Sequence, residues 1–409
     1  MRKKEDKLFF EFLQVAIRIR RSLSVAIGDS DWLRLFEFCK RQALVGIGFA
    51  AVEKLHNVGI VCPVNLRMKW MSLALQIEKK NALLNEQCKK LTEQYRHDGL
   101  ATCILKGQGN CLNYPEELRM RRMPGDIDLW AMPYEDISIA VQTGKEDVKY
   151  ITCHGHRAVI EYVRMQFRLQ GIDANPKACY HHIEAPTMDG TEVEVHYRPA
   201  FLRSPLRNWR MQRWFENHAD ECMKNRTHLG FSMMTSSVNV VYQMCHLYTH
   251  IFEGGIGLRQ LMDYYFALRV WHNDVMECKD LQSQGMWSEG MGTPVMSKEE
   301  VMAVLKSFGM GKFAAAVMYV LHKTFAMPTH YYICKPNEKE GRKLLAEIMQ
   351  GGNFGQYDTR DAALKKGGMI KHGVWKLKRV MRLVSSYPEE ALWEPVFRVY
   401  HLGWRIVHQ

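Results

Sequence analysis

The sequence predicts an α+β protein, with a small mixed β-sheet core in the middle of the chain and helical regions on both sides. Apolar residues recur at helical spacing up to residue 98 and again from residue 206. Short β-type runs fall between these regions, and Asp189-Gly190, a strong hairpin-turn signal, joins two of them. We therefore expect an N-terminal helical region (1–98), an α/β core (99–205) and a C-terminal helical region (206–409).

The N-terminal region begins with an amphipathic pattern. Acidic and basic residues interrupt the apolar residues of the first thirty positions, so we expect neither a signal peptide nor a membrane anchor. Helical spacing places a set of apolar residues on one face: Phe9, Phe12, Leu13, Ala16 and Ile17. Two longer helical patterns follow, WLRLFEFCKRQALVGIGFAAVEKL and LRMKWMSLALQIEKKNALLNEQCKKLTEQYRHDG.

The middle region contains the β-type runs. ATCILKG and GDIDLWA are short apolar strands, and a helical to loop-like segment, NCLNYPEELRMRR, lies between them. HHIEAPTMDGTEVEVHYRP supplies two further strands around the turn at Asp189-Gly190. These four strands form the predicted sheet.

The C-terminal region is helical again, and several of its residue pairs allow two interpretations. His246 and His250 have the spacing of a zinc-binding pair but fit a structural helix face better, because no glutamate follows the first histidine. Arg259 and Asp263 predict an ion pair on a helix surface, or a brace for the core. The basic end could hold RNA or form a solvated amphipathic helix; its residues are Lys365, Lys366, Lys371, Trp375, Lys376, Lys378 and Arg379.

Composition narrows the class of protein. The 409 residues are 47% hydrophobic and 24% charged, as in an ordinary globular protein, and no apolar run is long enough to span a membrane. Eleven scattered cysteines without a CxxC pair predict a reducing cytoplasm. The net charge of +12 favours a polyanionic partner such as a nucleoside triphosphate, RNA or DNA, although a solvated basic surface would give the same charge.

The most informative element is the pair of aspartates in GDIDL. Residues two apart in a strand project from the same face, so Asp126 and Asp128 point one way while Ile127 and Leu129 anchor the other face. Carboxylates held this close repel unless a cation lies between them. Mg²⁺, or Mn²⁺, together with phosphate oxygens fits this arrangement.

A third carboxylate is expected from a neighbouring strand. The run TEVEVH places Glu192, Glu194 and His196 on one face. Glu194 lies between two valines, as a buried strand carboxylate requires, and is therefore chosen over Glu192. His196 could hold a hydrogen bond or contact metal or substrate.

Upstream, LKGQGN predicts a strand that ends in a glycine turn and opens a helix. Lys106 and Arg122 could neutralise a triphosphate, and the turn residues Gly107, Gln108 and Gly109 could bring backbone N–H groups close to phosphate oxygens. The spacing is not that of a P-loop.

The run LKGQGNCLNYP…RRMPGDIDLW…VEVHYRP strongly resembles an uncharacterised bacterial nucleotidyltransferase family of the DNA polymerase β-like superfamily. The resemblance implies a polymerase β-like core in which Gly107 lies at the nucleotide, Asp126 and Asp128 bind two Mg²⁺ ions, and Glu194 assists one of them. Lys106, Arg122 and His196 also match family positions. The chain departs from many superfamily members by having Gly107-Gln108 where they have Gly-Ser or Gly-Gly, so phosphate contacts would come from Gln108, Gly109 or Asn110, or be absent.

The expected activity is transfer of a nucleoside monophosphate from an NTP to an acceptor hydroxyl, with release of pyrophosphate. The acceptor could be RNA, a protein or a small molecule. The alternative is a noncatalytic module of the same fold that binds nucleotide, RNA or a protein, which the positive charge and the altered turn favour.

Overall fold

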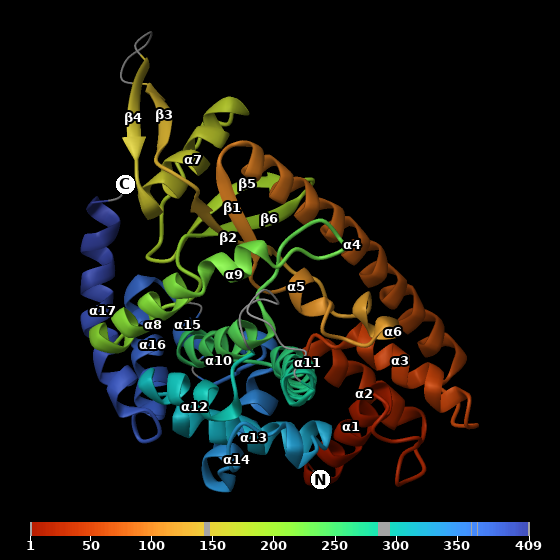
Figure 1. Ribbon diagram of the computed structural model, residues 1–409. Helices are drawn as coiled ribbons and strands as arrows, with labels where there is room; N and C mark the ends of the chain where they lie inside the picture. Colours follow the sequence, from red (N-terminus) through yellow and green to blue (C-terminus); the bar gives the residue numbers. More distant parts are fainter. Residues whose placement is uncertain (1, 143–147, 285–294, 361, 366, 408–409) are drawn as a thin grey trace. The chain divides into compact units, whose positions relative to one another are not determined.

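The computed structural model describes residues 2–142, 148–284, 295–360, 362–365 and 367–407 (Figure 1). It confirms the predicted α+β class, because helices predominate and a small mixed four-stranded sheet lies among them. The chain forms two compact units, each drawn from several segments. The first unit comprises Met1–Ala82, Cys111–Pro124 and Val240–Ala391, and the second comprises Leu83–Asn110, Gly125–Asn239 and Leu392–Gln409.

The second unit contains the four-stranded sheet, in the order β1-β2-β6-β5. Its strands are β1 (Leu100–Ile104), β2 (Ile127–Pro133), β5 (His182–Met188) and β6 (Thr191–His196). β1 is antiparallel to β2, β2 is parallel to β6, and β6 is antiparallel to β5. All four predicted strands are therefore present, and the sheet is mixed as expected.

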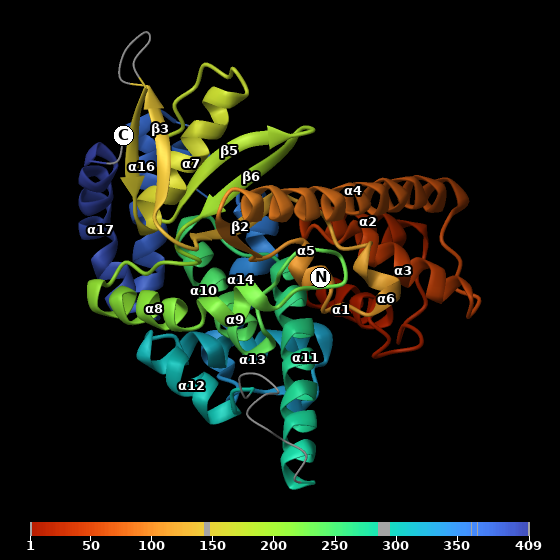
Figure 2. The ribbon, with the colours of Figure 1, turned by 45° about the horizontal axis from the view of Figure 1, so that its top comes forward.

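The turn between β5 and β6 has the predicted conformation. Asp189 and Gly190 both have positive φ angles, 47° and 74°, as a two-residue hairpin loop requires. A β-bulge between Ala185 and Met188 then shifts the pairing of the two strands. Figure 2 shows β5 and β6 side by side.

Two strands and one helix of the second unit were not predicted. β3 (Ile137–Gln142) and β4 (Val148–Cys153) form a separate antiparallel pair, and α7 (Gly155–Leu169) packs against β2, β3, β4 and β5. The unit also contains α8 (Pro205–Asn217) and α9 (Ala219–Lys224), with parts of α4 (Val64–His97), α5 (Gln108–Cys111), α10 (Ser236–Glu253) and α17 (Pro388–Val407). The scaffold around the sheet is thus built from helices far apart in the sequence.

The first unit is helical. Its N-terminal part holds α1 (Arg2–Ala16), α2 (Asp29–Arg41), α3 (Val45–His56) and the first part of α4, followed by α6 (Glu116–Arg119). Its remaining elements are most of α10, then α11 (Leu258–Ser283), α12 (Lys298–Ser307), α13 (Gly311–Phe325), η2 (Thr329–Tyr331), α14 (Glu338–Gly351), η3 (Asn353–Gly355), α15 (Ala362–Lys365), α16 (Met369–Val384) and the start of α17.

The amphipathic face predicted for the first helix is confirmed, because Phe9, Phe12, Leu13 and Ala16 are fully buried and Ile17 is 4% exposed. The rings of Phe12 and Trp70 lie 5.8 Å apart and join α1 to α4. Burial of these aromatic side chains stabilises the helical unit.

The basic C-terminal stretch falls largely in α16. Trp375 and Arg379 are buried, and the Arg379 guanidinium donates to the carbonyl of Ile251 at 2.8 and 3.0 Å. Lys371 and Lys378 are exposed, whereas Lys366 lies outside the described residues. Only part of this stretch is therefore the solvated face that the sequence suggests.

Across the described part of the chain, no helix is long and apolar enough to cross a membrane.

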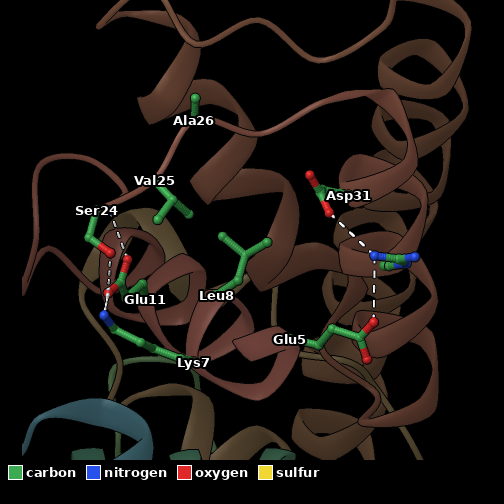
Figure 3. A pocket seen from close by; sticks show the side chains of 9 residues that line it. Glu5, Lys7, Leu8, Glu11, Ser24, Val25, Ala26 and Asp31 are labelled. Atoms are coloured by element: carbon green, nitrogen blue, oxygen red, sulfur yellow. Dashed lines mark hydrogen bonds and ion pairs between the residues drawn. The ribbon is translucent and has the colours of Figure 1, made fainter. Parts of the chain in front are cut away.

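A cavity of ≈ 530 Å³ lies beside α1 and α2 in the first unit (Figure 3). Glu11 accepts hydrogen bonds from the backbone and hydroxyl of Ser24, both at 2.8 Å. Arg34 lies 3.5 Å from both Glu5 and Asp31. The charged groups that line this cavity thus pair with one another, and we assign no chemistry to it.

Candidate active site on the four-stranded sheet

The parallel pairing of β2 and β6 places two acidic residues side by side. Asp128 and Glu194 are register partners, so their side chains share one face of the sheet. Ile127, Val193 and Val195 are buried on the opposite face and fix the strands there. Asp126, two residues before Asp128, lies directly ahead of β2. This register brings the predicted third carboxylate, Glu194, beside Asp128.

Asp128 is the buried centre of the cluster, with a side chain that is 1% exposed. Its Oδ1 atom lies 3.0 Å from Nζ of Lys106 and 3.1 Å from Nε2 of His196. Burial raises the pKa of Asp128, but Lys106 and His196 outweigh it and hold the pKa below its usual value. The carboxylate is therefore ionised.

His196 bridges the two acids, because Nε2 also lies 3.4 Å from Oε2 of Glu194. Burial alone would lower the pKa of His196, but the hydrogen bonds to Asp128 and Glu194 raise it to about 9. Burial tends to raise the pKa of Glu194, whereas His196 and His182 lower it to about 2. At neutral pH His196 is thus a cation between two carboxylates.

Lys106 supplies the second positive charge. Its Nζ lies 3.6 Å from Oδ2 of Asp126 as well as near Asp128. Burial alone would lower the pKa of Lys106. The negative charges of Asp128, Asp126 and Glu194 have the larger effect, so the pKa lies above its usual value. The preceding residue, Leu105, donates its N–H to the carbonyl of Asp128 at 3.0 Å, which fixes the lysine beside β2.

The glycine turn after Lys106 is tightly constrained. Gly107 has φ +61°, which favours glycine, and a Cβ there would lie 3.5 Å from the carbonyl oxygen of Asp126. Gly109 donates its N–H to the carbonyl of Lys106 at 3.3 Å. Gln108 is buried, and its amide donates to Oδ1 of Asn85 on α4 at 2.6 Å. This amide nitrogen is therefore directed at the scaffold.

The residues present fit a divalent cation. Oδ2 of Asp128 is buried and has no hydrogen-bond partner among the described residues. A buried ionised oxygen is costly without a partner, and a divalent cation would supply one. Ligand atoms of Asp128, Glu194 and His196 all lie within 4.8 Å of one another. Carboxylate oxygens are the ligands that Mg²⁺ or Mn²⁺ prefers, so Asp128 and Glu194 fit such an ion.

Arg122 has a different environment, in the first unit. Its buried guanidinium donates to both carboxylate oxygens of Asp263, at 2.7 and 2.8 Å, and Tyr114 donates its hydroxyl to Asp263 at 2.7 Å. Arg122 is therefore engaged in a bidentate ion pair. The interpretation of Arg259 and Asp263 as a surface pair is wrong, because they are only 9% and 3% exposed.

Two histidines that the sequence left unassigned also reach the site. His182 is the register partner of His196, and their ring centroids lie 5.2 Å apart. Nδ1 of His182 lies 2.9 Å from Nε2 of His181. Burial and the charge of His196 lower the pKa of His182 to about 4, so it is neutral at pH 7. The signal that could have found them is the His-His pair at the start of a strand facing TEVEVH.

Comparison with known proteins gives one match. A family model described as an uncharacterised nucleotidyltransferase matches residues 28–285, which include the four-stranded sheet and Asp126, Asp128 and Glu194. No curated protein and no solved structure matches the chain.

Proposed function

Because the chain belongs to the family of uncharacterised nucleotidyltransferases, we propose that it is an active, metal-dependent enzyme that transfers a nucleoside monophosphate from an NTP to an acceptor hydroxyl. The observation that carries this proposal is the buried Oδ2 of Asp128 beside Glu194 and His196, for which the described residues offer no hydrogen-bond partner. A noncatalytic module would have no need of a buried ionised oxygen without a partner.

In the proposed reaction, the acceptor oxygen bonds to the α-phosphorus as the bond to the bridging β-phosphate oxygen breaks. Pyrophosphate leaves with the bonding electron pair, and the acceptor loses its proton. Asp126, Asp128 and Glu194 would hold Mg²⁺ or Mn²⁺. When bound, the ion would neutralise charge on the phosphate oxygens.

The electrostatics of the cluster assign different roles to its residues. Glu194, with a pKa of about 2, is a weak base and suits ligation better than proton transfer. We assign proton acceptance to Asp126, whose side chain is 34% exposed, compared with 1% for Asp128. Lys106 would supply positive charge to the triphosphate, and Gly107 would allow it to approach the backbone closely.

The proposal is tested by incubating the protein with each α-labelled NTP, Mg²⁺ or Mn²⁺ and a cell extract that contains RNA, proteins and metabolites. We expect the wild type to transfer label, and the labelled fraction identifies the acceptor class. The Asp126→Asn/Asp128→Asn double variant should transfer none. The matched control is Asp220→Asn, an exposed aspartate paired with Lys224, which should transfer label normally. A wild type that binds no NTP in either metal would contradict the proposal.

A second candidate is a noncatalytic nucleotide-, RNA- or protein-binding module. The net charge of +12 and the Gln108 amide held by Asn85, in place of a turn serine, favour it. This candidate predicts salt-sensitive RNA binding that survives both EDTA and the loss of Asp126 and Asp128. Binding that depends on the divalent ion would exclude it.

A further inference from the structure

Three imidazoles meet where β5 begins and β6 ends. His182 and His196 are register partners on adjacent strands, and the residue before β5, His181, turns its ring onto theirs. The ring centroid of His181 lies 4.4 Å from that of His182 and 5.5 Å from that of His196. One ring nitrogen from each histidine lies within 4.8 Å of those of the other two.

His196 is oriented as a metal-ligating histidine would be. Its Nε2 faces the carboxylate of Asp128 at 3.1 Å, whereas Nδ1 is buried and has no hydrogen-bond partner in the part of the chain that the structure describes. Histidines that bind metals almost always direct their other ring nitrogen at a carboxylate or carbonyl, which fixes the ring. Asp128 fills that position here, and metal binding would displace the proton that His196 carries on Nδ1 at neutral pH.

We propose that His181, His182 and His196 form a transition-metal site for an ion of the Zn²⁺ type, distinct in chemistry from the carboxylate site. Imidazole nitrogens favour Zn²⁺, Co²⁺ or Ni²⁺, whereas Mg²⁺ prefers oxygen ligands. This inference does not depend on nucleotidyl transfer, because it rests on the three rings and on the contact that orients His196.

The spacing of the ring nitrogens suits such an ion. Zn–N bonds of about 2.0–2.1 Å place two nitrogens on a tetrahedral ion roughly 3.4 Å apart. Nδ1 of His182 and Nε2 of His181 are already 2.9 Å apart, so small ring rotations suffice. Three protein ligands leave a fourth position for water or a substrate oxygen. The ion would lie beside Glu194, whose carboxylate is 3.4 Å from His196.

The test uses Co²⁺ as a spectroscopic probe of the metal-stripped full-length protein. We expect a bound Co²⁺ ion with the visible absorption of nitrogen ligation. His181→Gln and His182→Gln should each weaken binding by about tenfold or more. The matched control, His97→Gln, removes a histidine whose side chain is 89% exposed and should leave binding unchanged. Circular dichroism verifies that each variant is folded.

Two further variants make the test decisive. His182→Cys should retain Co²⁺ and add a sulfur-to-metal charge-transfer band, which arises only if residue 182 is a ligand. Asp126→Asn should leave Co²⁺ binding at the histidines unchanged while it abolishes nucleotidyl transfer, so the two proposals can fail separately. Equal Co²⁺ affinity and spectra in the wild type and a folded His181→Gln/His182→Gln variant would overturn the histidine site.

Discussion

At the scale of single residues, the buried pair of Arg122 and Asp263 yields a direct prediction for stability. Both side chains are 4% exposed and share two hydrogen bonds. Asp263→Asn leaves the guanidinium buried without its counter-charge, and we expect a loss of about 3–5 kcal/mol in the free energy of unfolding. Urea denaturation measures this loss. Asp220→Asn, which breaks the exposed pair with Lys224, should have almost no effect.

A second variant separates charge from packing at this pair. Replacing both partners with apolar residues, as in Arg122→Met/Asp263→Leu, leaves no buried charge. The double variant should therefore be more stable than Asp263→Asn. If the double variant is less stable than Asp263→Asn, the hydrogen bonds and packing of the pair also contribute to the free energy of unfolding.

His196 yields a prediction for pH dependence in metal-free protein. Its pKa rises from 6.5 to about 9 between Asp128 and Glu194, and the rings of His181 and His182 are its other titratable neighbours. A raised pKa stabilises the fold in full below the unfolded value and loses this effect as pH rises through the folded value. The stability advantage of the wild type over His196→Gln should therefore be constant below about pH 6.5 and decline towards pH 9. Urea midpoints measured in EDTA across this range test it, and a constant difference would contradict it.

At the scale of elements, the sequence predicted the four sheet strands but not their register. A plain two-residue hairpin at Asp189-Gly190 would pair His182 with Tyr197. The bulge shifts the register by one residue, so that His182 pairs with His196. A shift of one residue moves every side chain to the other face. Counting residues outward from the turn would therefore not have placed His182 beside His196. The shared face of Asp128 and Glu194, in contrast, could be predicted from the apolar residues that flank each of them.

The missed β3–β4 pair had a signal in the sequence. Ile137, Ile139 and Val141 alternate with smaller or polar residues, and VKYITC continues β-type composition after them. Packing of α7 against these strands involves contacts between different elements, which no local pattern encodes.

Replacing either of two helix glycines with alanine should change the stability of the protein, in opposite directions for the two positions. A Cβ on Gly341 in α14 would overlap the side chain of Tyr319 in α13, whereas a Cβ on Gly373 in α16 would have no atom of the described residues within 4 Å. Gly341→Ala should therefore cost roughly 1–3 kcal/mol through overpacking. Gly373→Ala should stabilise the protein by about 1 kcal/mol through helix propensity. Thermal and urea unfolding measure both, and equal effects would show that the α13–α14 contact adjusts without strain.

At the scale of the whole molecule, each unit is assembled from distant segments. Arg122 lies just ahead of the aspartates in the sequence, but its carboxylate partner is 141 residues further on. Sequence proximity suggested a phosphate ligand, and the tertiary contacts that pair Arg122 with Asp263 could not be read from it. Local periodicity reports faces and turns, and it does not report which distant segments share a unit.

The location of the proposed site predicts where ligand protection will appear. NTP with Mn²⁺ should slow amide hydrogen exchange in β2 and β6 and leave α13 and α14 unaffected, because a ligand stabilises the states that bind it. Exchange measured by mass spectrometry tests this. The Asp126→Asn/Asp128→Asn variant should show no ligand-dependent change, and protection confined to the first unit would place nucleotide binding elsewhere.

The contact between His196 and Asp128 also affects the order in which the site assembles during folding, because it joins residues 68 positions apart. Closing such a loop is slow relative to forming helices and hairpins. A chain emerging from the ribosome would carry Lys106, Asp126 and Asp128 long before β6 is made. Until Glu194 and His196 are synthesised and paired with β2, the two aspartates have Lys106 but lack the neighbouring strand that completes the proposed cation site.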